Sequence, residues 1–183
     1  MTPIQVPTRD QVDEKASAIF DNLENNLGMV PNLYATIGYS SEVLEAYMNY
    51  SSIIGSSSFN KKEIEAIKLS VSEVNNCQYC KAAHTALAKM NGFTESETID
   101  IRTAQLKDAR LNTIVKTAQE LTAKRGRISD ETKEEFFGLS FSNKAFIDLI
   151  AIVNVVSFTN FVHNATQIPV DFPLAPAILG KTA

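Results

Sequence analysis

The residues of this chain that are best suited to chemistry lie between Asn75 and His84. The sequence has only two cysteines, Cys77 and Cys80, and His84 follows Cys80 by four positions. If a helix begins near Cys77, residues four and seven positions apart share one helix face, so the imidazole lies beside both thiols. The unpaired backbone N–H groups at a helix start favour an anion and lower the pKa of a thiol. The pattern predicts a dithiol redox site with a nucleophile, a resolving thiol and a group that moves protons.

The same residues permit other interpretations. A structural zinc site needs four ligands, and Cys77, Cys80 and His84 supply three of them. His163 or Glu65 becomes the fourth ligand only if the fold brings it close. The cysteine pair can also be without function, His84 can be an ordinary packed side chain, and Glu65 taken alone is a solvated surface carboxylate. The scarcity of cysteines and the register of the histidine with both thiols favour the redox interpretation.

The elements that must position this motif are predicted to be helices joined by short turns. Apolar residues recur at helical spacing over residues 12–27, and Gly28 stands where a C-terminal glycine belongs. A short helical segment over residues 31–39 follows. Ser41 can open a third helix that runs to Gly55.

The motif itself falls at the junction of the next two predicted helices. Asn60 followed by Glu63 has the form of a capping box, and apolar residues continue the fourth helix to Val74. The fifth helix starts around Gln78 and ends at Gly92, whose position suits a left-handed cap. Both cysteines therefore lie at the start of the fifth helix.

Four further helices are predicted in the second half of the chain: three have caps at Thr94, Asp108 and Ser142, and a short one follows Ser129. The sixth runs toward Lys107, the seventh ends before Gly126, and the last is a long apolar helix from Asn143 to about Ala165. Prolines forbid regular helix beyond it, at Pro169, Pro173 and Pro176. No repeat and no Pro- or Gly-rich linker divides the sequence. We therefore predict an all-α fold in which residues 1–183 form a single domain.

The composition is that of a globular protein and excludes several functional classes. Of the 183 residues, 44% are hydrophobic and 21% charged, which excludes wholesale disorder. The net charge of −4 and the absence of a basic cluster argue against nucleic acid or an anionic membrane as a partner. The apolar stretch over residues 145–162 contains Asp148 and Asn154, so we expect a buried helix and no membrane span. Residues 1–10 lack the features of a secretion signal, and we expect a cytoplasmic protein.

Together with Glu65, twelve positions before Cys77, the motif resembles that of the alkyl hydroperoxidase D-like (AhpD-like), or carboxymuconolactone decarboxylase-like, superfamily. The resemblance is to its peroxidase-related branch and covers nearly the whole chain. The segments that carry it are residues 27–34, 73–92, 125–127, 129–130, 158–160 and 171–173.

The resemblance implies an all-α, single-domain AhpD-like fold that assembles into homo-oligomers, either trimers or hexamers. It also implies a thiol-dependent peroxidase without a cofactor or metal. In this scheme Cys80 attacks a hydroperoxide and becomes a sulfenic acid, and Cys77 condenses with it to a disulfide. Glu65 and His84 relay protons, and an unidentified thiol or disulfide reductant restores the thiols. Helix-start electrostatics alone would make Cys77 the more acidic thiol, but the resemblance and the position of His84 favour Cys80 as the nucleophile.

The chain departs from the family pattern at two positions. Tyr79 stands between the cysteines where the hydroperoxidase D proteins have a histidine, so the relay is one base shorter. The order His163-Asn164 is the reverse of that in the branch, which leaves the role of this histidine open. Two other functions remain as alternatives. One is a non-catalytic redox sensor whose disulfide switches packing. The other is a decarboxylase-like enzyme, which would need an arginine or lysine near the site, and Lys81 is the only basic residue inside the motif.

Overall fold

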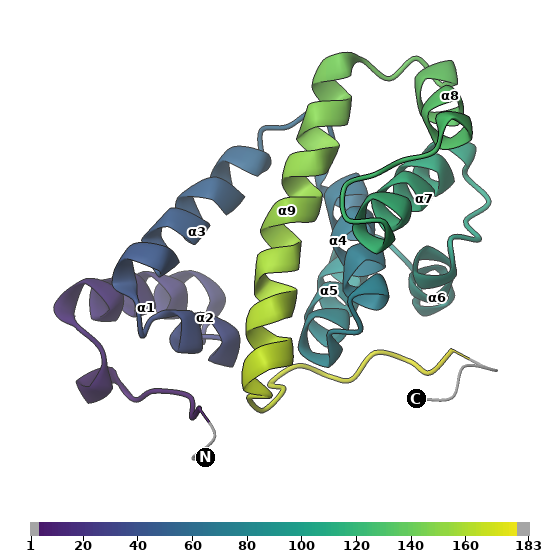
Figure 1. Ribbon diagram of the computed structural model, residues 1–183. Coiled ribbons are helices and arrows are strands. Elements are labelled where there is room, and N and C mark those ends of the chain that lie inside the picture. The colour runs from purple at the N-terminus through teal and green to yellow at the C-terminus, as the bar shows by residue number, and fades with distance from the viewer. Residues whose placement is uncertain (1–3, 179–183) are drawn as a thin grey trace.

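The computed structural model describes residues 4–178, and in this part of the chain it contains nine α-helices, one short 3-10 helix and no β-strands (Figure 1). After the 3-10 helix, Arg9–Gln11, the elements are α1 Glu14–Leu27, α2 Asn32–Ile37, α3 Ser41–Ile54, α4 Lys61–Val74, α5 Gln78–Met90, α6 Glu95–Thr103, α7 Ala109–Ala123, α8 Asp130–Gly138 and α9 Asn143–Thr166. The predicted all-α fold is confirmed. Each predicted helix is present, with ends that differ by a few residues.

Side-chain caps fix most helix starts where the sequence predicts them. At α4, Asn60 accepts the backbone N–H of Glu63, and the Glu63 carboxylate accepts the backbone N–H of Asn60. Thr94 and Glu97 form a second capping box at the start of α6. α3 begins at Ser41 as predicted, but the Ser41 hydroxyl donates to Asp13, the residue that caps α1, at 2.7 Å. Ser41 thus ties α3 to α1.

Helix α4 lies at the centre of the packing, against α5, α6, α7 and α9. Ala66, Ile67, Leu69 and Val71 are fully buried on it, so apolar residues occupy more than one face. A helix surrounded in this way buries its polar residues too. Glu65 of α4 is only 8% exposed.

Helix α9 runs through the middle of the molecule, with α1–α3 on one side and α4–α8 on the other (Figure 1). Its length and composition alone would allow it to cross a membrane, but the core helix of a soluble protein meets the same criterion. Leu149 and Ile152 are buried against the neighbouring helices, whereas Ile147 and Phe161 are exposed. The predicted buried helix is therefore buried on one face only.

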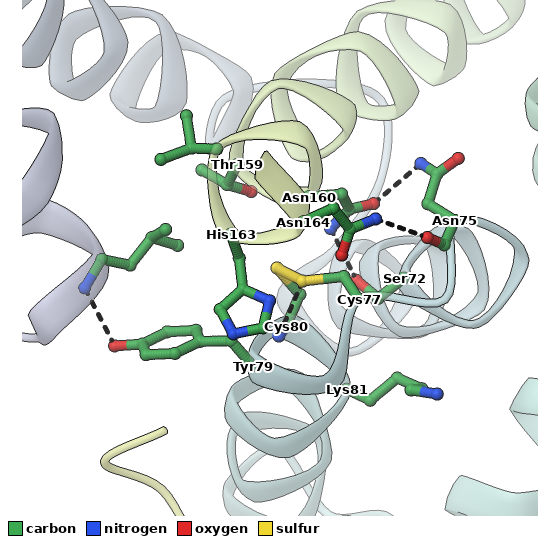
Figure 2. The surroundings of a disulfide bond; sticks show 12 residues. Ser72, Asn75, Cys77, Tyr79, Cys80, Lys81, Thr159, Asn160, His163 and Asn164 are labelled. Carbon is green, nitrogen blue, oxygen red and sulfur yellow. Dashed lines mark hydrogen bonds between the residues drawn. A yellow bond between two sulfur atoms is a disulfide. The ribbon is translucent and has the colours of Figure 1, made fainter. Parts of the chain in front are cut away.

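A hydrogen-bonded network joins the turn between α4 and α5 to α9 (Figure 2). The side-chain amide of Asn75 donates to Asn160 Oδ1 at 2.8 Å, and Asn160 donates to the hydroxyl of Ser72 at 3.2 Å. Asn164 donates to the backbone carbonyl of Asn75 at 2.8 Å. Because a buried polar network orders every group that takes part in it, the start of α5 is fixed against α9.

Residues 167–178 follow α9 without regular structure, as the prolines predict, and pack over the start of α5. The Asp171 carboxylate accepts the first backbone N–H of α2 at 2.7 Å. Phe172 meets the ring of Tyr79 edge-on, with ring centroids 5.6 Å apart. Further along, Arg102 of α6 donates to the carbonyl of Pro176. The tail is thus attached to α2, α5 and α6.

Candidate redox site

The two cysteines lie at the start of α5 and are joined in a disulfide (Figure 2). Their Cα atoms are 5.3 Å apart, within the range of about 4.4–6.8 Å that is usual for a disulfide. Cys77 is the N-cap residue of α5, and its Sγ accepts the backbone N–H of Cys80 at 3.1 Å. A thiolate at Cys77 would therefore be stabilised by the helix start, as the sequence predicts.

A two-residue turn between α4 and Cys77 sets this geometry. α4 ends at Val74, and Asn76 adopts a left-handed conformation with φ of 50°. Asparagine tolerates this conformation better than most residues other than glycine. The backbone N–H of Cys77 then donates back to the carbonyl of Ser72 at 3.0 Å. The turn is short and has no free backbone donor at the point where the cysteine pair begins.

Glu65 and His84 face each other across the contact between α4 and α5. Nδ1 of His84 lies 2.9 Å from Oε2 of Glu65, and Nζ of Lys68 lies 3.3 Å from Oε1. The Glu65 side chain is 10% exposed and that of His84 is 14% exposed. Glu65 is therefore not a solvated surface carboxylate. The expected contact between the two residues is present, while the proton relay through them stays a prediction.

The environment of Glu65 keeps it ionised. Burial alone would raise its pKa, but the charge and hydrogen bond of His84, together with those of Lys68, outweigh burial and hold the pKa at about 2. A carboxylate can only accept a hydrogen bond, so Nδ1 of His84 carries a proton in this pair. Nε2 of His84 is then the ring nitrogen that can accept a proton from another group.

We expect this carboxylate to make the stability of the fold depend on pH. A carboxyl group whose pKa is lower in the folded state stabilises the fold above its unfolded pKa, and that contribution disappears as the pH falls. For Glu65 the window runs from the ordinary value of 4.5 down to about 2. Urea unfolding should therefore show a smaller acid-induced loss of unfolding free energy for Glu65→Gln than for the unchanged protein. Equal losses in the two proteins would contradict the ion pair.

A cavity of about 310 Å³ opens beside the cysteine pair. Cys80, His84 and Lys68 form part of its wall, whereas Cys77 does not. Of the two cysteines, Cys80 is therefore the one that borders the cavity. Apolar and aromatic side chains from α2, α3, α5, α9 and the tail form most of the rest of the wall, among them Leu33, Tyr34, Tyr47, Leu87, Val155 and Phe172.

The alternative zinc site is not supported. Within residues 4–178, no three histidine, cysteine, aspartate or glutamate side chains form a group that could hold a metal ion. Glu65 bonds to His84. His163, the other candidate fourth ligand, belongs to the surroundings of the disulfide (Figure 2) but not to the wall of the cavity.

Local sequence patterns did not indicate Lys68 or the aromatic side chains that α2 and α3 bring to the cavity. Lys68 lies three positions after Glu65, a spacing that places both on one face of α4, so this spacing could have indicated the ion pair. Tyr34 and Tyr47 come from α2 and α3, and their ring centroids are 5.6 Å apart. No local pattern indicates that these rings reach the cavity, because their position depends on how α3 packs against α9.

The carboxymuconolactone decarboxylase family model matches residues 41–123, which include Glu65, both cysteines and His84. No curated protein matches the sequence.

Solved structures share the fold. The alkylhydroperoxidase AhpD core of an uncharacterised peroxidase-related protein from Ralstonia eutropha JMP134 is 19% identical, with a TM-score of 0.81 over 93% of this chain and 94% of that one. An uncharacterised peroxidase-related protein from Silicibacter sp. TM1040 is 24% identical, with a TM-score of 0.80 over 94% and 91%. The C82A variant of the debrominase Bmp8, in complex with 2,3,4-tribromopyrrole, is 19% identical, with a TM-score of 0.78 over 93% and 92%.

The family match covers the helices that carry the motif, and the structural likeness covers almost the whole chain. These findings agree with the family resemblance of the sequence. Residues 41–123 thus match the carboxymuconolactone decarboxylase family, and the fold of the chain is that of the AhpD-like proteins.

Proposed function

We propose that this protein is a thiol-dependent peroxidase that reduces organic hydroperoxides with its cysteine pair. The observation that carries the proposal is that Cys80, and not Cys77, shares the wall of the cavity with His84. The disulfide between the two cysteines supports a redox role. The likeness to two peroxidase-related proteins supports it further.

In the first step, Nε2 of His84 accepts the proton of the Cys80 thiol, and the thiolate attacks the terminal oxygen of the hydroperoxide. The O–O bond breaks, Cys80 becomes a sulfenic acid, and the leaving alkoxide takes the proton from His84 to become an alcohol. The ionised Glu65 at 2.9 Å stabilises the imidazolium that exists between these two proton transfers.

In the second step, the Cys77 sulfur attacks the Cys80 sulfenic sulfur and displaces hydroxide, which leaves as water. The product is the disulfide seen in the structure. An external thiol then enters through the cavity and attacks the sulfur of Cys80. Cys77 leaves as a thiolate, which the backbone N–H of Cys80 stabilises. A second donor thiol then displaces Cys80 from the mixed disulfide, and the donor leaves as a disulfide.

The wall of the cavity favours a substrate with an apolar body. Tyr34, Leu87 and Val155 offer apolar surface, and burial of such surface stabilises a complex by about 25 cal/mol per Å². We therefore expect an organic hydroperoxide to react faster than hydrogen peroxide, which leaves the same surface in contact with water.

Mass spectrometry of the reduced protein tests the proposal. One equivalent of cumene hydroperoxide should convert both thiols into the Cys77–Cys80 disulfide and release one equivalent of the alcohol. A dithiol donor should then sustain turnover. Two free thiols that persist in folded protein after this treatment would overturn the proposal.

A decarboxylase-like activity is a weaker candidate. It needs a cation to hold the carboxylate of a lactone acid. Lys68 lies in the wall of the cavity, but its ammonium group already pairs with Glu65 at 3.3 Å. A substrate carboxylate would have to compete with that buried partner.

Reductive debromination is a further candidate, because a debrominase crystallised with a tribromopyrrole shares the fold and the cavity here has an aromatic wall. In such a reaction the dithiol and an aryl bromide yield the disulfide, the arene and hydrogen bromide. Tribromopyrrole is therefore a useful second substrate in the turnover assay.

We also propose that the protein forms a homo-oligomer in the cytoplasm. Large apolar side chains are exposed on α3 and α9, including Ile53 at 71%, Ile147 at 63% and Phe161 at 62%. Exposed apolar surface of this kind favours association with another copy of the chain.

A further inference from the structure

Lys68 brings a positive charge to the wall of the cavity. Within the part of the chain that the structure describes, the residues that line the cavity include no aspartate, glutamate or arginine, and Lys68 is the one lysine among them. The rest of the wall is mostly apolar and aromatic, and the Lys68 side chain is 18% exposed. A cation in such surroundings attracts negative charge more strongly than a cation in water, because little solvent screens it.

The fold does not use all the hydrogen-bond donors of Lys68. A lysine ammonium carries three N–H donors. Among residues 4–178, its acceptor is a single atom, Oε1 of Glu65, at 3.3 Å. Charge-assisted hydrogen bonds are usually about 2.7–2.9 Å long, so this contact is a long one. The other N–H groups of Lys68 are therefore available to a molecule in the cavity.

The carboxylate of Glu65 links Lys68 to the group that serves Cys80. Oε1 of Glu65 accepts from Lys68, and Oε2 lies 2.9 Å from Nδ1 of His84. Glu65 does not line the cavity, whereas Lys68, His84 and Cys80 do. One buried carboxylate thus holds two members of the cavity wall, an ammonium and an imidazole, on its two oxygens. This arrangement keeps a cation close to the proposed proton acceptor of Cys80.

We propose that Lys68 donates a hydrogen bond to the leaving oxygen of the hydroperoxide and is a catalytic residue of the first step. The inference rests on the proposed peroxidase function and deepens it. Donors that are held in place where negative charge develops are among the strongest contributions to catalysis. A second cavity-lining group, in addition to His84, would therefore act on the substrate.

The step balances without a further reactant. The Cys80 thiolate forms a bond with the terminal oxygen as the O–O bond breaks, and the electron pair of that bond passes to the other oxygen. Lys68 stabilises the resulting alkoxide until the alkoxide takes the proton from His84 and leaves as an alcohol. Cys80 is oxidised to the sulfenic acid, the hydroperoxide is reduced, and Lys68 is unchanged.

This role does not require Lys68 to leave Glu65. A hydroperoxide is neutral before the reaction, and charge develops on its leaving oxygen only as the O–O bond breaks. An N–H group that Glu65 does not use is sufficient to meet that charge. A substrate carboxylate differs, because its charge is permanent and competes with Glu65 for the ammonium from the moment of binding.

The dependence of the rate on the leaving group tests the inference. In a Cys77→Ser background, stopped-flow measurements follow the first step alone. Cumene hydroperoxide releases a strongly basic alkoxide, whereas peroxyacetic acid releases acetate, which needs little stabilisation. Removal of one donor to a developing oxyanion costs about 100-fold or more, so we expect Lys68→Gln and Lys68→Met to lose about that factor with cumene hydroperoxide. Their rates with peroxyacetic acid should change little.

The ratio of the two rates is measured on one sample of each variant, so a partial loss of folded protein cancels from it. Lys61→Gln, at the exposed start of α4 and outside the cavity wall, is the matched control and should keep the ratio of the unchanged protein. Alkylation of Cys80 by iodoacetamide is a second readout, because it needs the thiolate but produces no oxyanion. The Lys68 variants should keep the alkylation rate, whereas Glu65→Gln should lower it.

These measurements separate the inference from the function on which it rests. Equal slowing with the two peroxides, or equal slowing of alkylation and hydroperoxide reduction, would show that Lys68 acts only through Glu65 and would overturn the inference. Unchanged rates in the Lys68 variants would also overturn it, while the peroxidase proposal would stand. If the unchanged protein reduced neither peroxide, the peroxidase proposal would fail and the inference would fail with it.

Discussion

Replacing Cys80 by serine is expected to abolish hydroperoxide reduction, whereas replacing Cys77 by serine should leave one turnover. Cys80 and His84 both lie in the wall of the cavity and Cys77 does not, so we expect a bound hydroperoxide to react with the sulfur of Cys80. Removal of a covalent nucleophile costs up to about 10⁶-fold in rate, and we expect a loss of about 10⁴-fold or more for Cys80→Ser. Cys77→Ser keeps the nucleophile but cannot form the disulfide, so Cys80 should stop as a sulfenic acid.

Stopped-flow consumption of cumene hydroperoxide and dimedone labelling measure these two outcomes. The Cys77→Ser variant should consume one equivalent and bind dimedone at Cys80, and Cys80→Ser should do neither. The opposite pattern, with activity lost in Cys77→Ser and one turnover kept in Cys80→Ser, would make Cys77 the nucleophile. That result would show that the helix start, and not the cavity, decides which thiol reacts.

The second large effect is expected at Glu65 and His84. A positioned general base contributes about 100-fold or more to rate, whereas an ordinary surface substitution changes stability by less than about 0.5 kcal/mol. His84→Gln removes the proposed acceptor of the Cys80 proton. Glu65→Gln removes the charge that orients and stabilises the imidazole at 2.9 Å. Both variants should slow thiolate formation at Cys80 about 100-fold and raise the apparent pKa of that thiol.

The pH dependence of Cys80 alkylation, in a Cys77→Ser background, measures this effect without a peroxide. Glu134→Gln, on the exposed face of α8, is a matched control that changes the same functional group far from the site. If Glu65→Gln and His84→Gln react like this control while remaining folded, the two residues are structural. The catalytic set would then consist of the cysteines alone.

Local patterns were sufficient to predict the helices. A capping box such as Asn60 with Glu63 is encoded within four residues, and Gly28 ends α1 in the left-handed conformation that a C-terminal glycine favours. The side-chain contact of Ser41 was not predictable from local patterns. Its hydroxyl bonds to Asp13, which is 28 positions away, and no nearby residue indicates that contact.

The part of the candidate site that lies on one helix was predictable from helix periodicity. The part that depends on packing between helices was not predictable. The four-residue spacing from Cys80 to His84 places both residues in the wall of one cavity. The separation of the two thiols, with Cys80 at the cavity and Cys77 outside it, depends on how α5 lies against α2, α3 and α9. The position of His163 depends on the packing of α9 against α5, two helices far apart in the sequence. Its approach to the disulfide was therefore not predictable.

The anchored turn between α4 and α5 also affects how well the proposed peroxidase would resist over-oxidation by its own substrate. Asn75 and Asn160 hold the start of α5, so we expect Cys77 to remain within bonding distance of Cys80 throughout the proposed cycle. A reactant held in this way acts at an effective concentration that can reach about 10⁵ M, far above any peroxide concentration in a cell. The sulfenic acid should therefore close to the disulfide before a second peroxide oxidises it irreversibly to the sulfinic acid. In the proposed peroxidase cycle, we therefore expect the rigid turn to protect Cys80 from over-oxidation, and a looser turn to leave the protein inactivated in proportion to the peroxide concentration.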